Sequence, residues 1–211
     1  MQYQDIFSKE VNRMDVYEVL EKRRTIRDFS DKEVDDSVLK RILNAALKAP
    51  SNDHLHQLEF VVVRGRDRIL PLIETVAENT KVIQQTGLEA GKAAMDADEL
   101  DMFVDALPKQ QRMLMQSGCL VLPFFRQIGC PLCQPAYQSS LNYFASAWAA
   151  MENIFLAAAA EGLACAFRIP IGDESTRVKK LVGAPEDYEL TCFLAVGSVK
   201  YFSQNGLQAL I

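Results

Sequence analysis

The sequence predicts a single domain in which helices and short strands alternate. The chain has 211 residues, enough for one domain with a sizeable core and marginal for two. Segments with amphipathic-helix spacing alternate with short β-branched or aromatic runs that are typical of strands. No internal repeat, low-complexity run or Gly/Ser-rich linker divides the chain. We therefore expect one domain over residues 1–211.

Two amphipathic helices are expected first. One spans residues 15–24 and ends in basic residues, and its apolar face consists of Val16, Val19 and Leu20. The other is capped by residues 35–37 and ends near Ala49, because Pro50 follows. Its core stripe consists of Val38, Leu39, Ile42, Leu43 and Ala46.

The rest of the chain continues the alternation. The run Phe-Val-Val-Val at residues 60–63 predicts a central strand. Helices are expected over residues 67–85 and 96–115, and Pro108 should kink or break the second. The remaining elements are a strand over 119–125, a helix over 139–161 closed by Gly162, a strand over 163–168, a helix over 174–182 and a last strand over 189–196.

The helix over 139–161 is apolar on nearly every side, which indicates burial all round. Glu152, Asn153 and Glu161 interrupt it, so we interpret it as a soluble buried helix and not as a lipid-spanning one. Eight alanines between Leu141 and Ala160 would let two such helices approach closely at a subunit interface. The alternative is a central core helix of a monomer.

Charge and cysteine content limit the function classes. A net charge of −5 argues against a general nucleic-acid binder, although a local basic pocket for one phosphorylated cofactor remains compatible with it. The N-terminus has charges of both signs and no apolar core, so no secretory signal is predicted. Five cysteines without a regular framework predict reduced thiols and a cytoplasmic protein.

Residues 23–27, Arg-Arg-Thr-Ile-Arg, follow the first helix. Three guanidiniums and a hydroxyl suit a phosphate, because arginine supplies forked, charge-assisted donors. The alternative is complementation of the helix dipole, which accounts for Arg23 and Arg24 better than for Arg27.

The loop over residues 49–57 joins a helix to a strand and offers Ser51, Asn52, Asp53, His54 and His56. A rigid scaffold holds binding groups at such places, and these side chains could meet the edge of a heteroaromatic ring. A Ser/His/Asp triad is weakly indicated, because no nucleophile elbow surrounds the serine. A metal site is also weakly indicated, since the two histidines lack a third ligand nearby.

Two further segments are less specific. The pair Cys130 and Cys133 has no second CxxC, so we interpret it as a structural or incidental loop, with no metal site. The turn over residues 168–173 could aim backbone N–H groups at a ligand. The sequence contains no GxGxxG and no Walker loop, which argues against a Rossmann dehydrogenase or a P-loop enzyme.

Taken in order, these segments resemble the nitroreductase family. Residues 23–29 are similar to its motif R-R-S-x-R-x-F, and residues 45–51 to A-A-x-x-A-P-S. Residues 151–163 resemble the central helix M-Q-N-x-x-L-A-A followed by x-G-L, and residues 195–197 match the end of the last core strand. The chain departs from the pattern at His54 and at His56-Gln57-Leu58, where the family has Asn and Q-P-W, and at Trp148, where it has a small residue.

The resemblance implies an α+β fold with a central mixed, mostly antiparallel sheet flanked by helices, in an interlocked homodimer. It implies FMN at the subunit interface and electron transfer from NADH or NADPH to a nitroaromatic, quinone or related electrophile. Alternatives are a specialised flavin reaction, such as reductive dehalogenation or flavin fragmentation, and a flavin-binding or sensing protein without nicotinamide turnover.

The resemblance also implies roles for particular residues. The phosphate and the flavin edge would be held by Arg23, Arg24, Thr25 and Arg27. The partner subunit would supply Pro50, Ser51, Asn52 and His54. The reactive face would be covered by Ile169, Pro170, Ile171 and Gly172. Lys200 would remain from a basic cluster that follows the last strand. We expect a backbone N–H of Ile171 or Gly172 to face flavin N5, with His54 or His56 as a competing general acid.

Overall fold

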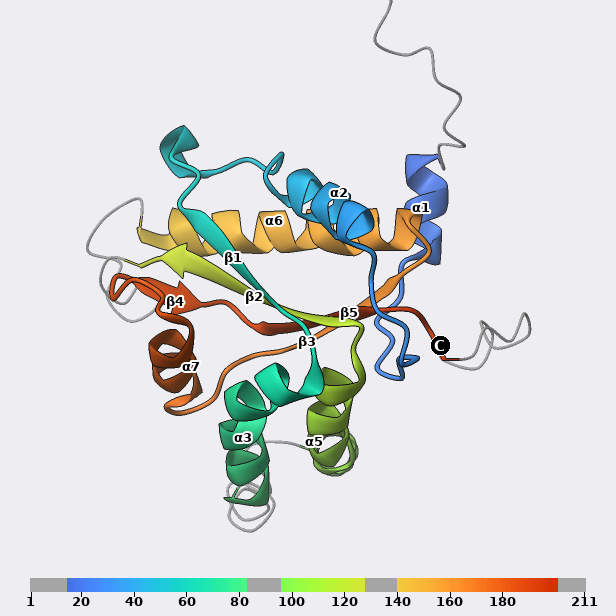
Figure 1. Ribbon diagram of the computed structural model, residues 1–211, viewed down its shortest axis with the longest axis vertical. Helices are drawn as coiled ribbons and strands as arrows, with labels where there is room; N and C mark the ends of the chain where they lie inside the picture. The colour runs from blue at the N-terminus through green and yellow to red at the C-terminus, as the bar shows by residue number, and fades with distance from the viewer. Residues whose placement is uncertain (1–14, 83–95, 128–139, 201–211) are drawn as a thin grey trace, which may run out of the picture.

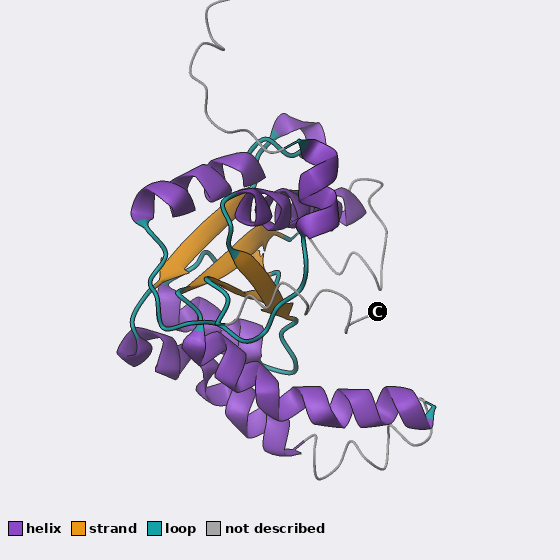
Figure 2. Ribbon diagram, turned by 90° about the vertical axis from the view of Figure 1, so that its right-hand side faces the viewer, coloured by secondary structure: helices purple, strands orange, loops and turns teal. Residues whose placement is uncertain are grey.

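A five-stranded antiparallel sheet lies between two layers of helices (Figures 1 and 2). The computed structural model describes residues 15–82, 96–127 and 140–200. The strands are β1 (Leu58–Val63), β2 (Cys119–Arg126), β3 (Ala164–Arg168), β4 (Tyr188–Leu190) and β5 (Phe193–Gly197). The helices are α1 (Val16–Lys22), α2 (Asp36–Ala46), α3 (Arg66–Val82), α5 (Ala97–Gln116), α6 (Ser140–Ala160) and α7 (Glu174–Val182), with the short 3-10 helix η1 (Asn52–His54).

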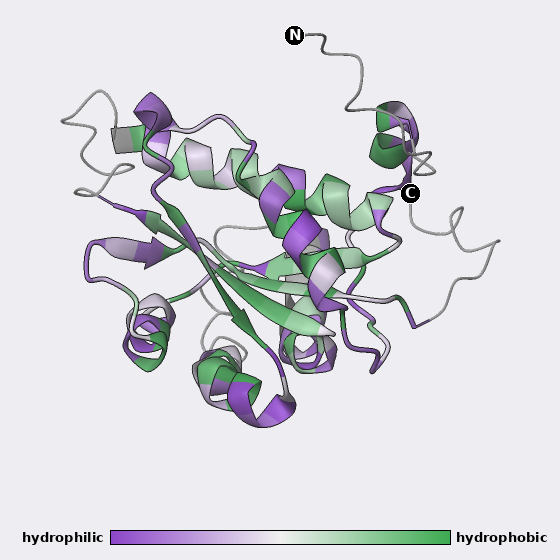
Figure 3. Cartoon of the chain, turned by 45° about the horizontal axis from the view of Figure 1, so that its top comes forward, coloured by the Kyte–Doolittle hydropathy of each residue, from purple (hydrophilic) through white to green (hydrophobic). Residues whose placement is uncertain are grey.

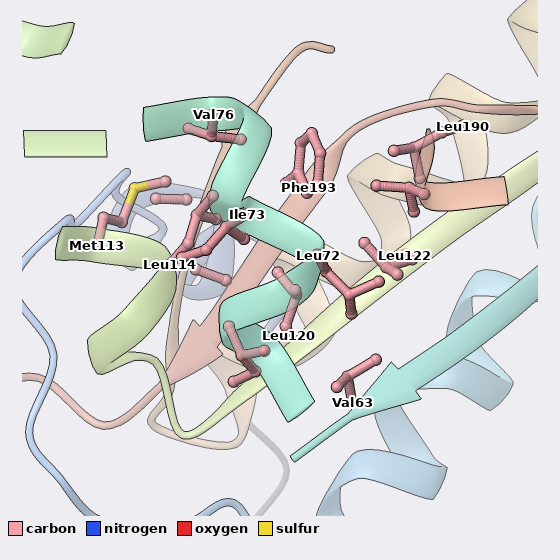
Figure 4. Close-up of a cluster of buried hydrophobic side chains, with 14 of the residues drawn as sticks. Val63, Leu72, Ile73, Val76, Met113, Leu114, Leu120, Leu122, Leu190 and Phe193 are labelled. Carbon is pink, nitrogen blue, oxygen red and sulfur yellow. The ribbon is translucent and has the colours of Figure 1, made fainter. Parts of the chain in front are cut away.

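Each face of the sheet has its own apolar core. Successive side chains of a strand point to opposite faces, so β2 sends Val121 toward α2 and α6 and Leu120 and Leu122 toward α3 and α5. Figure 4 shows Leu120 and Leu122 among side chains of α3 and α5. The hydropathy colouring of Figure 3 marks the strands as mostly hydrophobic.

The ends of two helices follow the chemistry of the sequence. The Asp35 side chain accepts from the backbone N–H groups of Ser37 and Val38 and so caps α2. Gly162 takes a φ of +73° after α6, which lets the N–H of Leu163 reach back to Ala158 O at 2.8 Å. Both ends confirm the expected boundaries.

The prediction that β1 is central is wrong. Its described pairing is with β2 alone, so it is an edge strand in the order β1-β2-β5-β3. Val61 and Val62 nonetheless pack against the cores on opposite faces. The β-branched run therefore indicates that helices cover both faces of this strand. It does not indicate whether both edges of the strand are paired.

Pro108 does not break the predicted helix, because α5 continues from Ala97 to Gln116 with Pro108 inside it. Proline removes one backbone hydrogen bond and crowds the preceding turn. Met113 and Leu114, in the next turn and a half, are fully buried, and their packing holds the C-terminal half of the helix in place.

The single last strand that was predicted is two strands, β4 and β5. Phe124 pairs with Leu190 and Val121 pairs with Leu194, so three residues, 191–193, lie opposite two on β2. Pro123 stands at this bulge and has no N–H to give to the ladder, although its carbonyl accepts from Thr191 N–H at 2.8 Å. A proline inside β2 thus divides the partner strand.

The described cysteines Cys119, Cys165 and Cys192 are free and buried, as expected for reduced thiols. Cys130 and Cys133 lie outside the described residues. No helix in the described ranges is long and apolar enough to cross a membrane.

Candidate functional site

The arginine-rich segment leaves α1 and runs along the sheet. Arg23 closes the helix, and Thr25 forms an isolated parallel bridge with Cys165 of β3. Further on, Phe29 bridges Val199, and the Lys200 N–H donates to Asp28 O at 3.3 Å. The backbone segments that carry Arg27 and Lys200 are therefore neighbours, although 173 positions separate the two residues in sequence.

The side chains of this segment divide into two groups. Arg24 Nη1 donates to the backbone oxygens of Glu21 and Arg23, which is the helix-end role of the alternative interpretation. Arg27 is exposed and lies beyond the helix. Within residues 15–82, 96–127 and 140–200, no acid forms an ion pair with Arg23, Arg24, Arg27 or Lys200. The pair of segments therefore presents cations that no described acid neutralises.

The loop over residues 49–57 is anchored to the start of α6. Asn52 is buried, its N–H donates to Ser146 Oγ at 2.9 Å, and its Oδ1 accepts from Asn142 Nδ2 at 3.2 Å. Sequence reasoning missed these two helix residues. The available signal was two polar side chains four positions apart on an otherwise apolar helix.

The outer part of this loop is exposed and locally strained. His54 and His56 are exposed, and both take a positive φ, as does Asp53. Such backbone conformations are uncommon for residues other than glycine. A hollow beside the loop is lined by residues of α2, of the loop and of α6, among them Ala46, Asn52 and Ala147. In the described part of the chain, no cluster of three or more metal-ligating side chains is present.

The turn after β3 exposes Ile169 and Ile171 and places Gly172 at a φ of +59°. The N–H of Ile171 donates to Glu174 Oε2 at 2.9 Å, so this amide is already engaged. The N–H of Gly172 has no acceptor among the described residues. Of the two amides expected to donate to a ligand, the Gly172 N–H is therefore the one that the described residues leave available.

A buried ion pair underlies this turn. Arg168 at the end of β3 and Glu174 at the start of α7 have side chains that are 2% and 0% exposed, and they form a double hydrogen bond. Sequence reasoning did not connect them. Opposite charges six positions apart, on either side of a five-residue connection, were the only signal, and spacing alone does not indicate burial.

The predicted segments do not all meet within one chain. The 23–27 segment lies where β3 begins, just after the C-terminal end of α6, whereas Asn52 contacts α6 at Asn142 and Ser146 (Figure 1). Roughly 20 Å of helix separates Ser146 from the end of α6. The structure joins the arginine segment to Lys200 and leaves residues 50–54 at a distance.

The sequence profile of the Nitroreductase family matches residues 20–198 of this chain. The chain belongs to the nitroreductase family. This result confirms the resemblance drawn from the motifs. A protein of Methanothermobacter thermautotrophicus, provisionally named NADH dehydrogenase/NAD(P)H nitroreductase, is 39% identical over 59 residues, which are 28% of this chain and 31% of that protein. The matched stretch thus spans about a third of that relative's length.

Solved structures of nitroreductase-family proteins share the fold. Oxidized iodotyrosine deiodinase, bound to FMN and 3-iodo-L-tyrosine, has a TM-score of 0.71 at 20% identity, covering 90% of this chain and 92% of that one. An FMN-dependent nitroreductase of Clostridium difficile R20291 has a TM-score of 0.61 at 19% identity, with 88% of each chain covered. At these identities the likeness establishes the α+β nitroreductase fold.

Proposed function

We propose that the protein is an FMN-dependent oxidoreductase that passes reducing equivalents from NADH or NADPH to a nitroaromatic, quinone or related electrophile. The observation that carries the proposal is the juxtaposition of Arg27 and Lys200, cations without a described acid partner, in a nitroreductase-family fold. A phosphate group is stabilised by charge-assisted hydrogen bonds from such donors. The residues present therefore fit the phosphate end of FMN, with Arg23, Arg24 and Thr25 beside them.

The geometry along β3 fits the rest of the cofactor. Thr25 bridges Cys165, and the exposed turn begins at Ile169, four residues or about 13 Å of extended chain further on. FMN carries its phosphate and its ring at opposite ends of a ribityl chain, so it would lie along β3 between the two segments. In this arrangement Gly172 would offer its N–H to the ring, and Ile169 and Ile171 would cover the ring and exclude water.

When bound, FMN would accept a hydride and deliver it to the acceptor, and the chain would supply binding, orientation and electrostatics. The arginines and Lys200 would hold the phosphate charge at one end of β3. The turn at the other end would fix the ring position. No described residue of this turn needs to act as an acid or a base.

We further propose a homodimer whose partner subunit supplies Pro50, Ser51, Asn52 and His54 to each cofactor. The distance between residues 50–54 and the arginine segment within one chain supports this. Exposed apolar residues Val16, Tyr17 and Leu20 on α1, with Leu141 on α6, offer surface for the contact. We also propose that residues 1–211 form one domain, and the free thiols support a reducing compartment such as the cytoplasm.

Two alternatives each have a supporting observation. Reductive dehalogenation is favoured by the sequence similarity to iodotyrosine deiodinase 1 of Mus musculus, which is 35% identical over 66 residues, or 31% of this chain and 23% of that protein. Flavin binding or sensing without nicotinamide turnover is favoured by the single Lys200 after the last strand, where the resemblance leads one to expect a basic cluster.

The visible spectrum of the purified protein tests the proposal. A flavin absorption band that bleaches under anaerobic NADH or NADPH, and returns on addition of a nitroaromatic or quinone, would support the oxidoreductase. A flavin that neither nucleotide reduces would support the sensing alternative. Turnover confined to a halogenated phenol would support dehalogenation, and a protein that binds no FMN would refute all three.

A further inference from the structure

The Glu174 carboxylate, fully buried at the base of the 169–172 turn, accepts four hydrogen bonds. Its Oε1 accepts from Arg168 Nη2 at 2.8 Å and from Asn79 Nδ2 at 3.0 Å. Its Oε2 accepts from Arg168 Nη1 and from the Ile171 N–H at 2.9 Å. Each oxygen thus has two donors, and these donors come from β3, from α3 and from the turn itself.

Arg168 is held with equal completeness. Its Nε donates to Gln110 Oε1 of α5 at 3.0 Å, and its Nη1 also donates to Ile169 O at 3.3 Å. Its guanidinium carbon lies 5.8 Å from the centre of the Phe193 ring. The ion pair therefore connects the turn to helices α3, α5 and α7 and to strands β3 and β5.

Asn79 adds a second link between α3 and the turn, because its Nδ2 also donates to Ile171 O at 3.4 Å. A buried ion pair is a weak source of stability, since desolvation of both charges offsets their attraction. A cluster whose donors all converge on one carboxylate instead restricts the positions of the residues that carry those donors. Here it determines the position of a short, otherwise exposed turn.

We propose that Glu174 is a positioning residue for the 169–172 turn, and that its pairing with Arg168 keeps the charge behind a bound flavin neutral. This inference rests on the proposed function, which sets the turn against the flavin. Glu174 engages the Ile171 N–H and so leaves the Gly172 N–H as the free donor of the turn. Without Glu174, an uncompensated arginine would lie directly behind the turn.

Amide hydrogen exchange on the full-length protein tests the positioning role without reliance on flavin. We expect the Ile171 amide to exchange slowly in the wild type although its side chain is exposed. Asn79→Ala removes the hydrogen bonds from α3 to Ile171 O and to Glu174, and Glu174→Gln replaces the charged acceptor of the Ile171 N–H with a neutral amide. Both changes should speed this exchange by about tenfold or more. Arg177→Gln is the matched control, since it breaks exposed ion pairs to Asp173 and Glu78 in the same region.

Equal exchange in the wild type and all three variants would overturn the positioning role. Rapid exchange of the Ile171 amide in the wild type would overturn it as well. If Glu174→Gln does not fold, Asn79→Ala still decides the question, because it leaves both buried charges in place.

The midpoint potential of bound FMN tests the charge role. Reduction adds negative charge to the flavin, so Glu174→Gln, with Arg168 uncompensated, should shift the potential to more positive values. The double change Arg168→Gln with Glu174→Gln removes both charges and should return the potential toward the wild-type value. An unchanged potential in Glu174→Gln, or equal shifts in both variants, would overturn the charge role. Absence of FMN binding by the wild type would refute the proposed function, while the exchange measurements would still decide the positioning role.

Discussion

Phe29 packs over Gly197 so closely that a Cβ atom on the glycine would lie 2.9 Å from Phe29 Cδ1. The same atom would lie 2.9 Å from the backbone nitrogen of Gly118. Phe29 is buried and bridged to Val199, so it cannot move aside without disturbing the segment that carries Arg27. Close approach therefore explains why the last core strand ends in glycine.

Gly197→Ala should lower the free energy of unfolding by about 1–3 kcal/mol, as overpacking of a close contact does. Urea denaturation measures the change. Ser198→Ala, at the next position, is the control and should leave the free energy of unfolding within about 0.5 kcal/mol of the wild type. Equal stability of the two variants would contradict the close packing of Phe29.

Arg27→Ala should weaken FMN binding by about 1.5–3 kcal/mol, the contribution of a hydrogen bond between charged groups. The same change at Arg23 should act alike, whereas Arg24→Ala should have less effect because its guanidinium is engaged at the helix end. Fluorescence titration with FMN gives the Kd. Lys22→Ala removes a charge from the same helix end, where it pairs with Glu18, and serves as the control. Equal affinities for Arg27→Ala and Lys22→Ala would return the segment to a helix-end role.

Light scattering over a dilution series should give about twice the chain mass of 23.7 kDa, because the proposed cofactor site takes residues from two subunits. Leu20→Glu on the exposed face of α1 should shift the mass toward that of the single chain. Leu181→Glu introduces the same charge at another exposed leucine, on α7 across the sheet, and should leave the mass unchanged. A monomer that retains FMN at high dilution would refute the shared site.

Burial raises the pKa of the Cys119 thiol from its ordinary value of 9.0 to about 12, and burial raises the pKa of Cys165 and Cys192 as well. The folded pKa exceeds the unfolded one, so this stabilising contribution is complete below about pH 9 and is lost as pH rises toward about 12. The free energy of unfolding should therefore fall over that interval. A thiol reagent at pH 8 should label these three cysteines only after denaturation, and rapid labelling of the native protein would contradict their burial.

Local chemistry in the sequence predicts much of this fold. The Asp35 cap, the Gly162 stop and the boundaries of α7 follow from side-chain and backbone preferences within a few residues. The edge position of β1 could not be predicted, because strand order depends on contacts between distant segments. The split between β4 and β5 likewise depends on Pro123 in another strand.

The candidate site was likewise predictable where it depends on local sequence, and not predictable where it depends on contacts between distant segments. The motifs predicted a phosphate site at residues 23–27, and in the structure the backbone segments that carry Arg27 and Lys200 are neighbours through the Phe29–Val199 bridge. The Glu174 network was not predictable, since Asn79 of α3 donates to Glu174 and Gln110 of α5 accepts from Arg168, and both residues are far in sequence from residues 168–174. Neither a local sequence pattern nor the composition indicates that these distant side chains meet around Glu174.

In the proposed function the 169–172 turn lies against the flavin ring. The Ile171 N–H donates to Glu174, so Gly172 supplies the N–H that is left for a ligand. Gly172 has a φ of +59°, a backbone conformation that residues other than glycine rarely adopt. Ile171→Ala should therefore alter acceptor preference through shape while leaving flavin reduction by NADH or NADPH largely intact. The competing role is protonation of the acceptor by His54 or His56, which are exposed and positioned by a strained loop. Stopped-flow measurement of both half-reactions across pH separates the two. A rate that does not change between about pH 5 and 8, and is unaffected by His54→Gln and His56→Gln, would support the backbone donor. A step within that range that disappears in either variant would assign the proton to histidine and leave the Gly172 amide with orientation alone.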